Sequence, residues 1–316
     1  MRRYAFCVVL AFALLVLLTV PVSADVVYST GMNNVNSTTI SDRVQVTGDG
    51  TVLRNDGKLF SVTVTDGGKL RNRGDIYGPV LVENGGILEN LYVAGVGGAS
   101  STLGQMYGTY GNTVVGNGGT LMTNNWVSGQ TILKGTGVIT GNKHGSLSAL
   151  TVTDGAVFDT NKFLGGIGGQ FNLTANGILL FGVTSADEFS KIMLYSSPSG
   201  PTHTLEGTIQ VNFNDSFFYG AIPEQNISFD LANLFQKLNP TMINGEWIAS
   251  GLFDLGTEFD WENRISLYGT DGYVATFNGS VVDFTRESSP VPEPATLLLV
   301  GLGVAGVAVA RRRKSR

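Results

Sequence analysis

The sequence has almost none of the residues that build disulfides, metal sites and covalent catalytic centres. Its 316 residues include one cysteine, Cys7, and two histidines, His144 and His203. A single cysteine excludes an intrachain disulfide and a metal site made of several thiolates. Neither histidine has a partner at metal-ligand spacing, and the motifs HExxH, GxxxxGK[ST] and GxSxG are absent. We therefore expect no catalytic residue, no bound metal and no cofactor.

Charged residues are also scarce. They make up 14% of the chain, where about 25% is usual. A helical bundle or coiled coil needs many Glu, Lys, Leu and Ala residues at helical spacing, so these fold classes are disfavoured. Glycine is abundant instead, with 43 residues, and hydrophobic residues reach 42%. That composition argues against disorder and favours a chain of short strands and turns.

Positive charge is nearly confined to the two ends. Seven of the 20 Lys and Arg residues lie there, whereas residues 25–291 carry 13 basic and 24 acidic side chains. Within that interior, 25–162 has 9 basic against 10 acidic residues, and 163–291 has 4 against 14. An acidic surface repels phosphate backbones, so we expect no nucleic-acid partner.

Residues 1–24 have the three parts of a secretory signal peptide. Arg2 and Arg3 precede a long apolar run, which ends at Pro21 and the small-residue site Val22-Ser23-Ala24. This order predicts export and cleavage between Ala24 and Asp25. The alternative is an uncleaved membrane anchor, because the apolar run is long for a signal peptide.

The C-terminal segment, 287–316, contains three unlike elements in order. Pro292-Glu293-Pro294 comes first, then the uncharged residues 295–310, then a basic tail over 311–316 that includes Arg311, Arg312, Arg313 and Lys314. Sixteen helical residues span about 24 Å, slightly less than the ~30 Å hydrocarbon core of a bilayer. We expect a transmembrane helix over 295–310, with the basic tail kept in the cytoplasm by the positive-inside rule.

This order of elements closely resembles the PEP-CTERM sorting signal. The resemblance implies processing by exosortase, a transpeptidase-like membrane enzyme of Gram-negative bacteria, with Pro292, Glu293 and Pro294 as its recognition motif. It also implies delivery to the cell surface or the exopolysaccharide matrix after transient anchoring in the membrane. The alternative is an ordinary tail anchor that is never processed.

One pattern recurs along residues 44–160: a β-branched strand, an Asp/Asn-Gly pair and a second strand that often ends in Asn. Gly50, Gly67 and Gly85 are 17 and 18 residues apart. One such unit is too short to bury its own apolar face, but stacked units bury a shared stripe. We expect that stripe to consist of Val62, Val64, Leu70, Val80, Val82 and Leu88.

The glycines would supply the positive φ of the corners, and recurrent asparagines could stack into side-chain ladders. The pattern resembles the passenger repeats of autotransporters, which implies a right-handed parallel β-helix. The alternative is a set of β-hairpins, because Asp-Gly and Asn-Gly are also hairpin turns. We therefore predict an all-β fold: a β-helix-like solenoid over 25–162 and an acidic, β-rich region over 163–286 that continues or caps it. A short helix is also expected at Leu231, Leu234, Phe235 and Leu238, ending before Pro240.

Two groups of charged residues are the only candidates for chemistry. Asp254, Glu258, Asp260 and Glu262 form the densest carboxylate group, which suits Ca²⁺ by ligand type but lacks EF-hand spacing. A solvated acidic edge is the favoured interpretation. Arg71 and Arg73 near Asp75 are the candidates if the protein were a polysaccharide lyase on a β-helix. The sequence favours a non-catalytic surface or matrix protein, with exosortase as its processing enzyme and exopolysaccharide as a partner.

Overall fold

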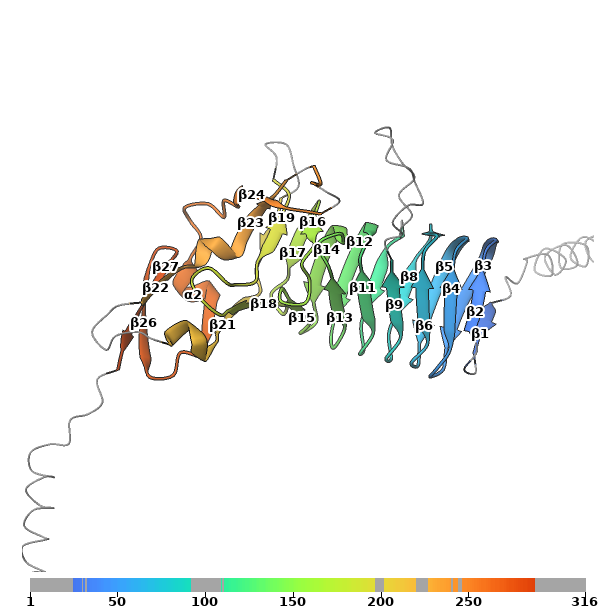
Figure 1. Cartoon of the computed structure of the whole chain (residues 1–316), viewed down its shortest axis with the longest axis horizontal. Coiled ribbons are helices and arrows are strands. Elements are labelled where there is room, and N and C mark those ends of the chain that lie inside the picture. The colour runs from blue at the N-terminus through green and yellow to red at the C-terminus, as the bar shows by residue number, and fades with distance from the viewer. Residues whose placement is uncertain are drawn as a thin grey trace, which may run out of the picture.

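A computed structural model describes residues 25–29, 31, 33–91, 109, 111–196, 202–219, 227–239, 241–243 and 246–287. These residues form an elongated stack of short strands, with the N-terminal strands at one end and the C-terminal strands at the other (Figure 1). Nowhere in the described ranges is a helix both long and apolar enough to cross a membrane. The predicted signal peptide (1–24), sorting motif (292–294), transmembrane helix (295–310) and basic tail (311–316) lie outside the described residues.

Two long sheets form most of the stack: the first extends from β1 to β24, and the second covers the N-terminal part only. The first has, along its main path, β1 (Val26–Tyr28), β3 (Thr39–Thr47), β5 (Lys58–Thr65), β8 (Val80–Val82), β10 (Thr113–Val115), β12 (Trp126–Lys134), β14 (Ser146–Thr153), β16 (Gly166–Ile167), β19 (Ile192–Leu194), β23 (Phe235–Leu238) and β24 (Ala249–Leu252), with β7 (Asp75–Ile76), β17 (Phe171–Leu173) and β20 (Thr204–Leu205) beside it. The second has β13 (Val138–Gly141), β11 (Thr120–Thr123), β9 (Ile87–Asn90), β6 (Lys69–Asn72), β4 (Val52–Asn55) and β2 (Asn33–Asn36).

Two smaller sheets complete the C-terminal part. The third sheet has β15 (Val157–Asp159), β18 (Ile178–Val183), β21 (Thr208–Phe213) and β25 (Ile265–Tyr268). The fourth has β22 (Ile227–Asp230), β27 (Val281–Arg286) and β26 (Tyr273–Asn278). Three short helices are described: the 3₁₀ helices η1 (Asp215–Phe218) and η2 (Leu231–Leu234), and the α-helix α2 (Trp261–Arg264).

The chain alternates between sheets as it advances. It passes from β3 in the first sheet to β4 in the second, then to β5 in the first and β6 in the second. We call one such pair of strands a coil. Each strand pairs in parallel with its equivalent in the next coil, as β3 does with β5 and β4 with β6. The hairpin alternative is therefore wrong for these corners, because hairpins would pair adjacent strands antiparallel.

The Asp/Asn-Gly pairs form the corners between the sheets. The non-glycine residues with positive φ among those described all precede a corner glycine: Asp66, Asn84, Asn117 and Asp154, with φ of 50°, 48°, 47° and 53°. Gly85 follows with a φ of 75°, a region that favours glycine because it has no Cβ. Gly86 is needed for another reason, since a Cβ there would lie 2.2 Å from the Val64 carbonyl oxygen of the coil before it.

The core is a set of apolar columns between the sheets. Val62 of β5 stacks on Val80 of β8, and Leu70 of β6 stacks on Leu88 of β9, with all four side chains at most 2% exposed. The whole predicted stripe is buried. Burying one Val or Leu side chain contributes roughly 1.5–3 kcal/mol, so a column is stable only when several coils supply it. The all-β class with parallel sheets is confirmed, whereas the hand of a closed coil stays a prediction.

The C-terminal part adds antiparallel pairing to the stack. Parallel pairing continues from β14 to β16 and β17, and from β18 to β21 and β25. The fourth sheet is antiparallel, with β27 between β22 and β26. Phe213 of β21 joins it to the stack through ring contacts with Phe229 at 5.7 Å and Phe284 at 4.9 Å between centroids.

The helix expected at Leu231–Leu238 is mostly absent. Leu231–Leu234 form one 3₁₀ turn, capped by the Asp230 carboxylate, and Phe235–Leu238 form the strand β23. Phe235 lies opposite Ile192 of β19 in parallel register. The apolar spacing also suits a buried turn followed by a strand, and pairing with β19 satisfies the backbone of the second half.

Candidate functional site

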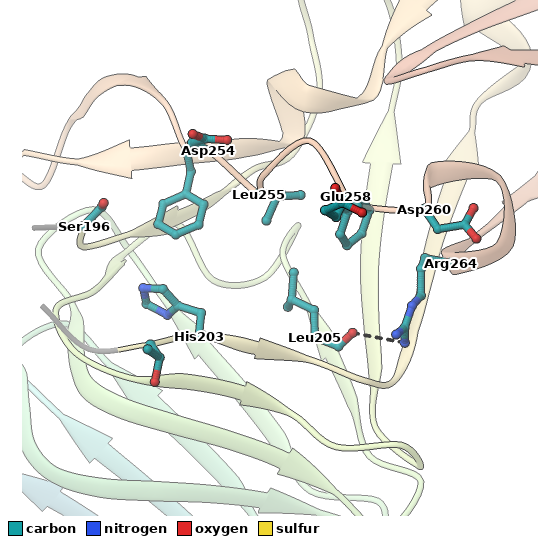
Figure 2. Close-up of a pocket in the computed structure, with 11 residues that line it drawn as sticks. Ser196, His203, Leu205, Asp254, Leu255, Glu258, Asp260 and Arg264 are labelled. Carbon is teal, nitrogen blue, oxygen red and sulfur yellow. Dashed lines mark hydrogen bonds between the residues drawn. The ribbon is translucent and has the colours of Figure 1, made fainter. Parts of the chain in front are cut away.

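A cavity of about 570 Å³ lies between the segment that leads into β20 and the loop that joins β24 to α2 (Figure 2). Its lining residues are Ser196, Thr202, His203, Leu205, Phe253, Asp254, Leu255, Glu258, Phe259, Asp260 and Arg264. The Arg264 guanidinium closes one end, because its Nη1 donates to the carbonyl oxygens of Leu205 at 3.3 Å and Glu206 at 3.1 Å. Three of the four predicted carboxylates, those of Asp254, Glu258 and Asp260, thus line one cavity.

Two of these carboxylates are engaged in local turns. Asp254 accepts a hydrogen bond from the Gly256 amide at 2.8 Å. Asp260 caps α2 and accepts from the backbone and side-chain nitrogens of Asn263 at 3.1 and 2.8 Å. The side-chain bond from Asn263, then its backbone bond, hold the pKa of Asp260 below the usual range, with a smaller effect from Arg264.

Glu262, the fourth predicted carboxylate, is not among the residues that line this cavity. Throughout the part of the chain that the structure describes, no three His, Cys, Asp or Glu side chains are grouped so as to hold a metal ion. The cavity is thus an acidic pocket in which Asp254 and Asp260 cap local turns, rather than a cluster of ligands that converge on one point.

His203 links β17 to the segment that follows β19, beside this cavity. Its Nδ1 accepts a hydrogen bond from the Phe171 amide at 3.1 Å, so its Nε2 carries the proton and donates to the Tyr195 carbonyl at 2.9 Å. The ring also packs edge-on against Phe253, 5.0 Å between centroids. Burial lowers the pKa of His203, opposed in part by the Tyr195 carbonyl. Both nitrogens are occupied, which suits a structural tie between segments better than proton transfer.

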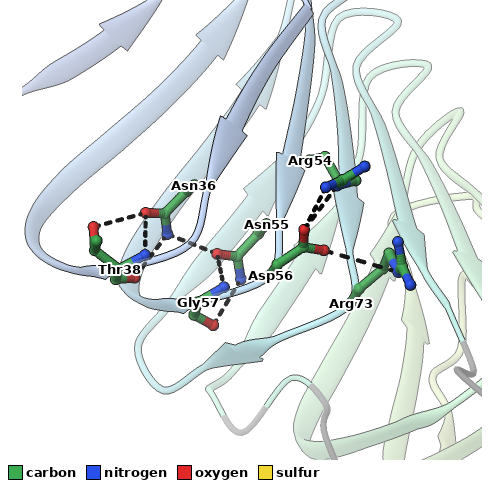
Figure 3. A network of polar contacts seen from close by, with 7 residues as sticks. All are labelled: Asn36, Thr38, Arg54, Asn55, Asp56, Gly57 and Arg73. Atoms are coloured by element: carbon green, nitrogen blue, oxygen red, sulfur yellow. Dashed lines mark hydrogen bonds and ion pairs between the residues drawn. The ribbon is translucent and has the colours of Figure 1, made fainter. Parts of the chain in front are cut away.

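Arg71 and Arg73, the candidates for lyase chemistry, form ion pairs with carboxylates other than Asp75. Arg71 Nε lies 2.9 Å from Glu89 Oε2, and Arg73 Nε lies 3.8 Å from Asp56 Oδ1. Asp75 accepts instead from the Tyr77 hydroxyl at 3.2 Å. Figure 3 shows Arg54 and Arg73 on either side of Asp56. The Arg71–Glu89 and Arg73–Asp56 pairs link neighbouring coils, and the expected Arg–Asp75 grouping is not formed.

The same corner holds a ladder of buried asparagines. Asn36, Asn55, Asn72 and Asn90 are at most 4% exposed and come from four successive coils. Each Nδ2 donates to the Oδ1 of the next, at 2.8, 2.8 and 3.0 Å along the row. Asn55 Oδ1 also accepts from the Gly57 amide at 3.2 Å (Figure 3). The predicted asparagine ladder is confirmed, and its amides serve the scaffold.

Sequence analysis missed a pair of aromatic cavities near the middle of the stack. One, of about 250 Å³, is lined by Trp126, Ser146, Leu147, Ser148, Gly168, Tyr195, Leu238 and Trp247. The other, of about 210 Å³, is lined by Lys143, Leu164, Phe189, Ser190, Lys191, Met193, Trp247, Ile248 and Ala249. These residues come from segments more than a hundred positions apart and share no local motif. The only sequence signal is that Trp126 and Trp247 are two of the three tryptophans in the chain.

A family model described as the PEP-CTERM protein-sorting motif matches residues 290–314. The chain therefore carries this motif at its C-terminal end, and the match includes Pro292, Glu293 and Pro294 together with Arg311 to Lys314. The motif indicates an exported, cell-surface-directed protein that exosortase processes. No match to this chain was found among curated proteins or among solved structures. The similarity of residues 44–160 to autotransporter repeats stays a prediction.

Proposed function

We propose that this chain is a non-catalytic surface protein of a Gram-negative bacterium, which has a structural or adhesive role in an exopolysaccharide matrix. The observation that carries the proposal is the sorting motif at 290–314, which begins three residues after Glu287, the last described residue. The strand β27 ends at Arg286, so the sorting motif follows the folded body almost directly. Export then delivers the body to the outside while the C-terminal segment stays in the membrane.

The sorting segment holds the motif Pro292-Glu293-Pro294 at a fixed depth in the bilayer. Pro292 and Pro294 oppose regular helix through the motif and keep it extended. The predicted helix 295–310 anchors this motif in the membrane, and the basic residues 311–314 fix the orientation of the helix. An enzyme embedded in the bilayer acts on a bond presented at its own depth. Exosortase is therefore a partner before processing, and the membrane is only a transient one.

The body suits a mechanical role. We infer that its parallel strands form a right-handed solenoid, in which each coil contacts mainly the coils before and after it. Asparagine hydrogen bonds join four successive coils and apolar columns continue along the stack, so load is shared by many similar contacts. Such a rod holds its two ends apart and presents long side faces to the matrix.

Catalysis is not part of the proposal. Arg71 and Arg73 are held by Glu89 and Asp56, and Asp254 and Asp260 cap their own turns. We expect the purified full chain to release no product from uronate or neutral polysaccharides, with or without Ca²⁺. Steady product release that disappears when Arg71 is replaced would favour the lyase alternative.

The proposal is tested by fractionating cells that contain or lack exosortase. With the enzyme, we expect the protein at the surface or in the matrix, without the peptides that follow the motif in mass spectra. Without it, the full chain should remain in the membrane fraction. A chain that ends at Arg316 in both strains would mean that the tail is an ordinary anchor. A processed chain that is retained in the periplasm would exclude the surface role.

A further inference from the structure

Trp247 forms the wall between the two aromatic cavities. It lines both, one of about 250 Å³ with Trp126 and Tyr195, and one of about 210 Å³ with Lys143 and Lys191. Each is smaller than the roughly 300–1,000 Å³ of pockets that enclose drug-sized ligands. Two small cavities that share a wall suit neighbouring units of a chain-like ligand better than one compact molecule.

Hydrogen bonds hold the Trp126 ring and the backbone of Trp247 in place. Trp126 Nε1 donates to Ser148 Oγ at 2.7 Å, which fixes its indole beside the cavity. The backbone amide of Trp247 donates to the Lys143 carbonyl at 2.8 Å, which ties its segment to the preceding coils. Both tryptophans and Tyr195 remain only half-buried. Rings that are fixed before binding lose little entropy when a ligand covers them.

The surroundings of these rings are mixed in polarity. Ser146 and Ser148 line the same cavity as Trp126, beside the apolar Leu147 and Leu238. A pyranose has the same division, with C–H groups on its faces and hydroxyls at its edges. Aromatic rings flanked by hydroxyls therefore fit a sugar ring on both counts, through apolar contact with its face and hydrogen bonds to its edge.

The second cavity adds positive charge. Lys143 Nζ lies 3.5 Å from Glu246, whereas Lys191 is exposed and forms no ion pair with any residue that the structure describes. Residues 163–291 hold only 4 basic residues against 14 acidic ones, and Lys191 is one of the four. A cation without an ion-pair partner among the described residues, in such an acidic region and next to an aromatic wall, complements a carboxylate on the ligand.

We propose that the cavities on either side of Trp247 bind a segment of an acidic polysaccharide. One sugar ring packs beside Trp247 and Trp126, and the carboxylate of an adjacent uronate lies near Lys191. The inference rests on the proposed function for the class of partner, but its site is argued from these side chains alone.

The test measures binding of tetragalacturonate to the purified full chain in detergent by calorimetry, with the methyl-esterified tetramer as the uncharged counterpart. We expect the acid to bind, and the ester to bind several-fold more weakly. Trp247→Ala should weaken binding about tenfold, the scale of one lost aromatic contact, and Trp247→Phe should recover part of it. Lys191→Glu should weaken binding of the acid but leave that of the ester unchanged.

Three controls separate site loss from misfolding and from bulk charge. Gly168→Phe places a ring in the first cavity without replacing either tryptophan, and the Cβ that it adds at Gly168 has no atom within 4 Å; it should abolish binding with an unchanged unfolding midpoint. Tyr77→Ala removes an aromatic that is 42% exposed on another coil and should have no effect. Lys237→Glu makes the same charge change on an exposed residue that lines neither cavity, and binding should persist.

Wild-type affinity in Trp247→Ala or Gly168→Phe would overturn the inference, as would equal losses in Lys191→Glu and Lys237→Glu. Failure of the tetramers of galacturonate, glucuronate and guluronate to bind would overturn it as well. None of these results bears on processing by exosortase, which the fractionation experiment measures separately.

Discussion

Asn55 and Asn72 lie on adjacent coils, and the Asn55 side-chain amide donates to the Asn72 side-chain carbonyl at 2.8 Å. Both residues are at most 1% exposed. Asn55 Nδ2 also donates to the Gly57 and Asp75 carbonyls at 3.3 and 3.4 Å, so these buried amides are fully satisfied only when the coils are in register. A shift of one residue would place Asn55 opposite Arg71 or Arg73 and would break this hydrogen bond.

Replacing Asn72 by Leu should destabilise the protein strongly. The change leaves Asn90 Oδ1 without its ladder partner, at a cost of about 1–3 kcal/mol for the unpaired group. Asn55 Nδ2 keeps only its longer hydrogen bonds to the Gly57 and Asp75 carbonyls. Denaturant unfolding measures the loss. Asn212→Leu is the control, because Asn212 points outward from β21 and is exposed. Similar stability in both variants would mean that the ladder adds nothing to the fold.

Replacing Gly85 by Val should strain a corner. Its φ of 75° is unfavourable for a β-branched residue, and we expect a loss of roughly 1–3 kcal/mol in unfolding free energy. The matched control is Gly168→Ala, where φ lies outside the positive region and the added Cβ has open space. If thermal unfolding shows equal midpoints for the two variants, the corner tolerates a side chain and its glycine is not required.

Replacing Thr131 by Val should stabilise the core. Thr131 is fully buried in a column between Thr113 and Leu150, and its hydroxyl has no hydrogen-bond partner among the described residues. Valine has nearly the same shape without the unpaired group, so a gain of about 1 kcal/mol is expected. Equilibrium unfolding would show a higher midpoint, and an unchanged or lower midpoint would indicate that the hydroxyl is satisfied in solution.

Acidification should weaken the protein through His203. Its pKa is lowered from 6.5 in the folded state, so the unfolded chain binds the proton more readily. Its contribution to stability is thus complete above about pH 6.5 and is lost as the pH falls from there towards the folded-state pKa. A protonated ring would also turn a second N–H towards the Phe171 amide.

The measurement compares unfolding free energies of wild type and His203→Gln between pH 7.5 and pH 5. The variant should lose part of the pH dependence, whereas His144→Gln should keep it. If the unfolding free energies of wild type and His203→Gln change with pH in parallel, the His203 hydrogen bonds are not a source of pH sensitivity.

Replacing Pro292, Glu293 and Pro294 with three alanines should abolish processing and leave membrane insertion intact. The apolar residues 295–310 and the basic tail are unchanged, so anchoring persists while the Pro-Glu-Pro motif is lost. The variant should accumulate in the membrane fraction with its C-terminal peptide detectable by mass spectrometry. Normal release of the triple variant would contradict recognition through this motif.

Local order in the chain was sufficient to predict the coils, the buried stripe and the sorting motif. A corner such as Asp66-Gly67, with a β-branched strand before it, determines a strand–turn–strand unit because both depend on residues next to each other. Pro292-Glu293-Pro294 is likewise contiguous and needs no fold to be recognised. The same local information was misleading at Phe235–Leu238, where pairing with β19 outweighed helical spacing.

Only the tertiary structure decided which distant residues become neighbours. It paired Arg71 with Glu89 rather than with Asp75, which is nearer in the sequence. It placed His203 between Phe171 and Tyr195. It also brought Trp126, Tyr195 and Trp247 together around one cavity. Such contacts depend on the register between coils and on the number of residues in each coil. The spacing between equivalent corner glycines is 17 residues from Gly50 to Gly67 but 33 from Gly85 to Gly118. Composition therefore determined the kind of scaffold, and the stacking of coils determined where its side chains meet.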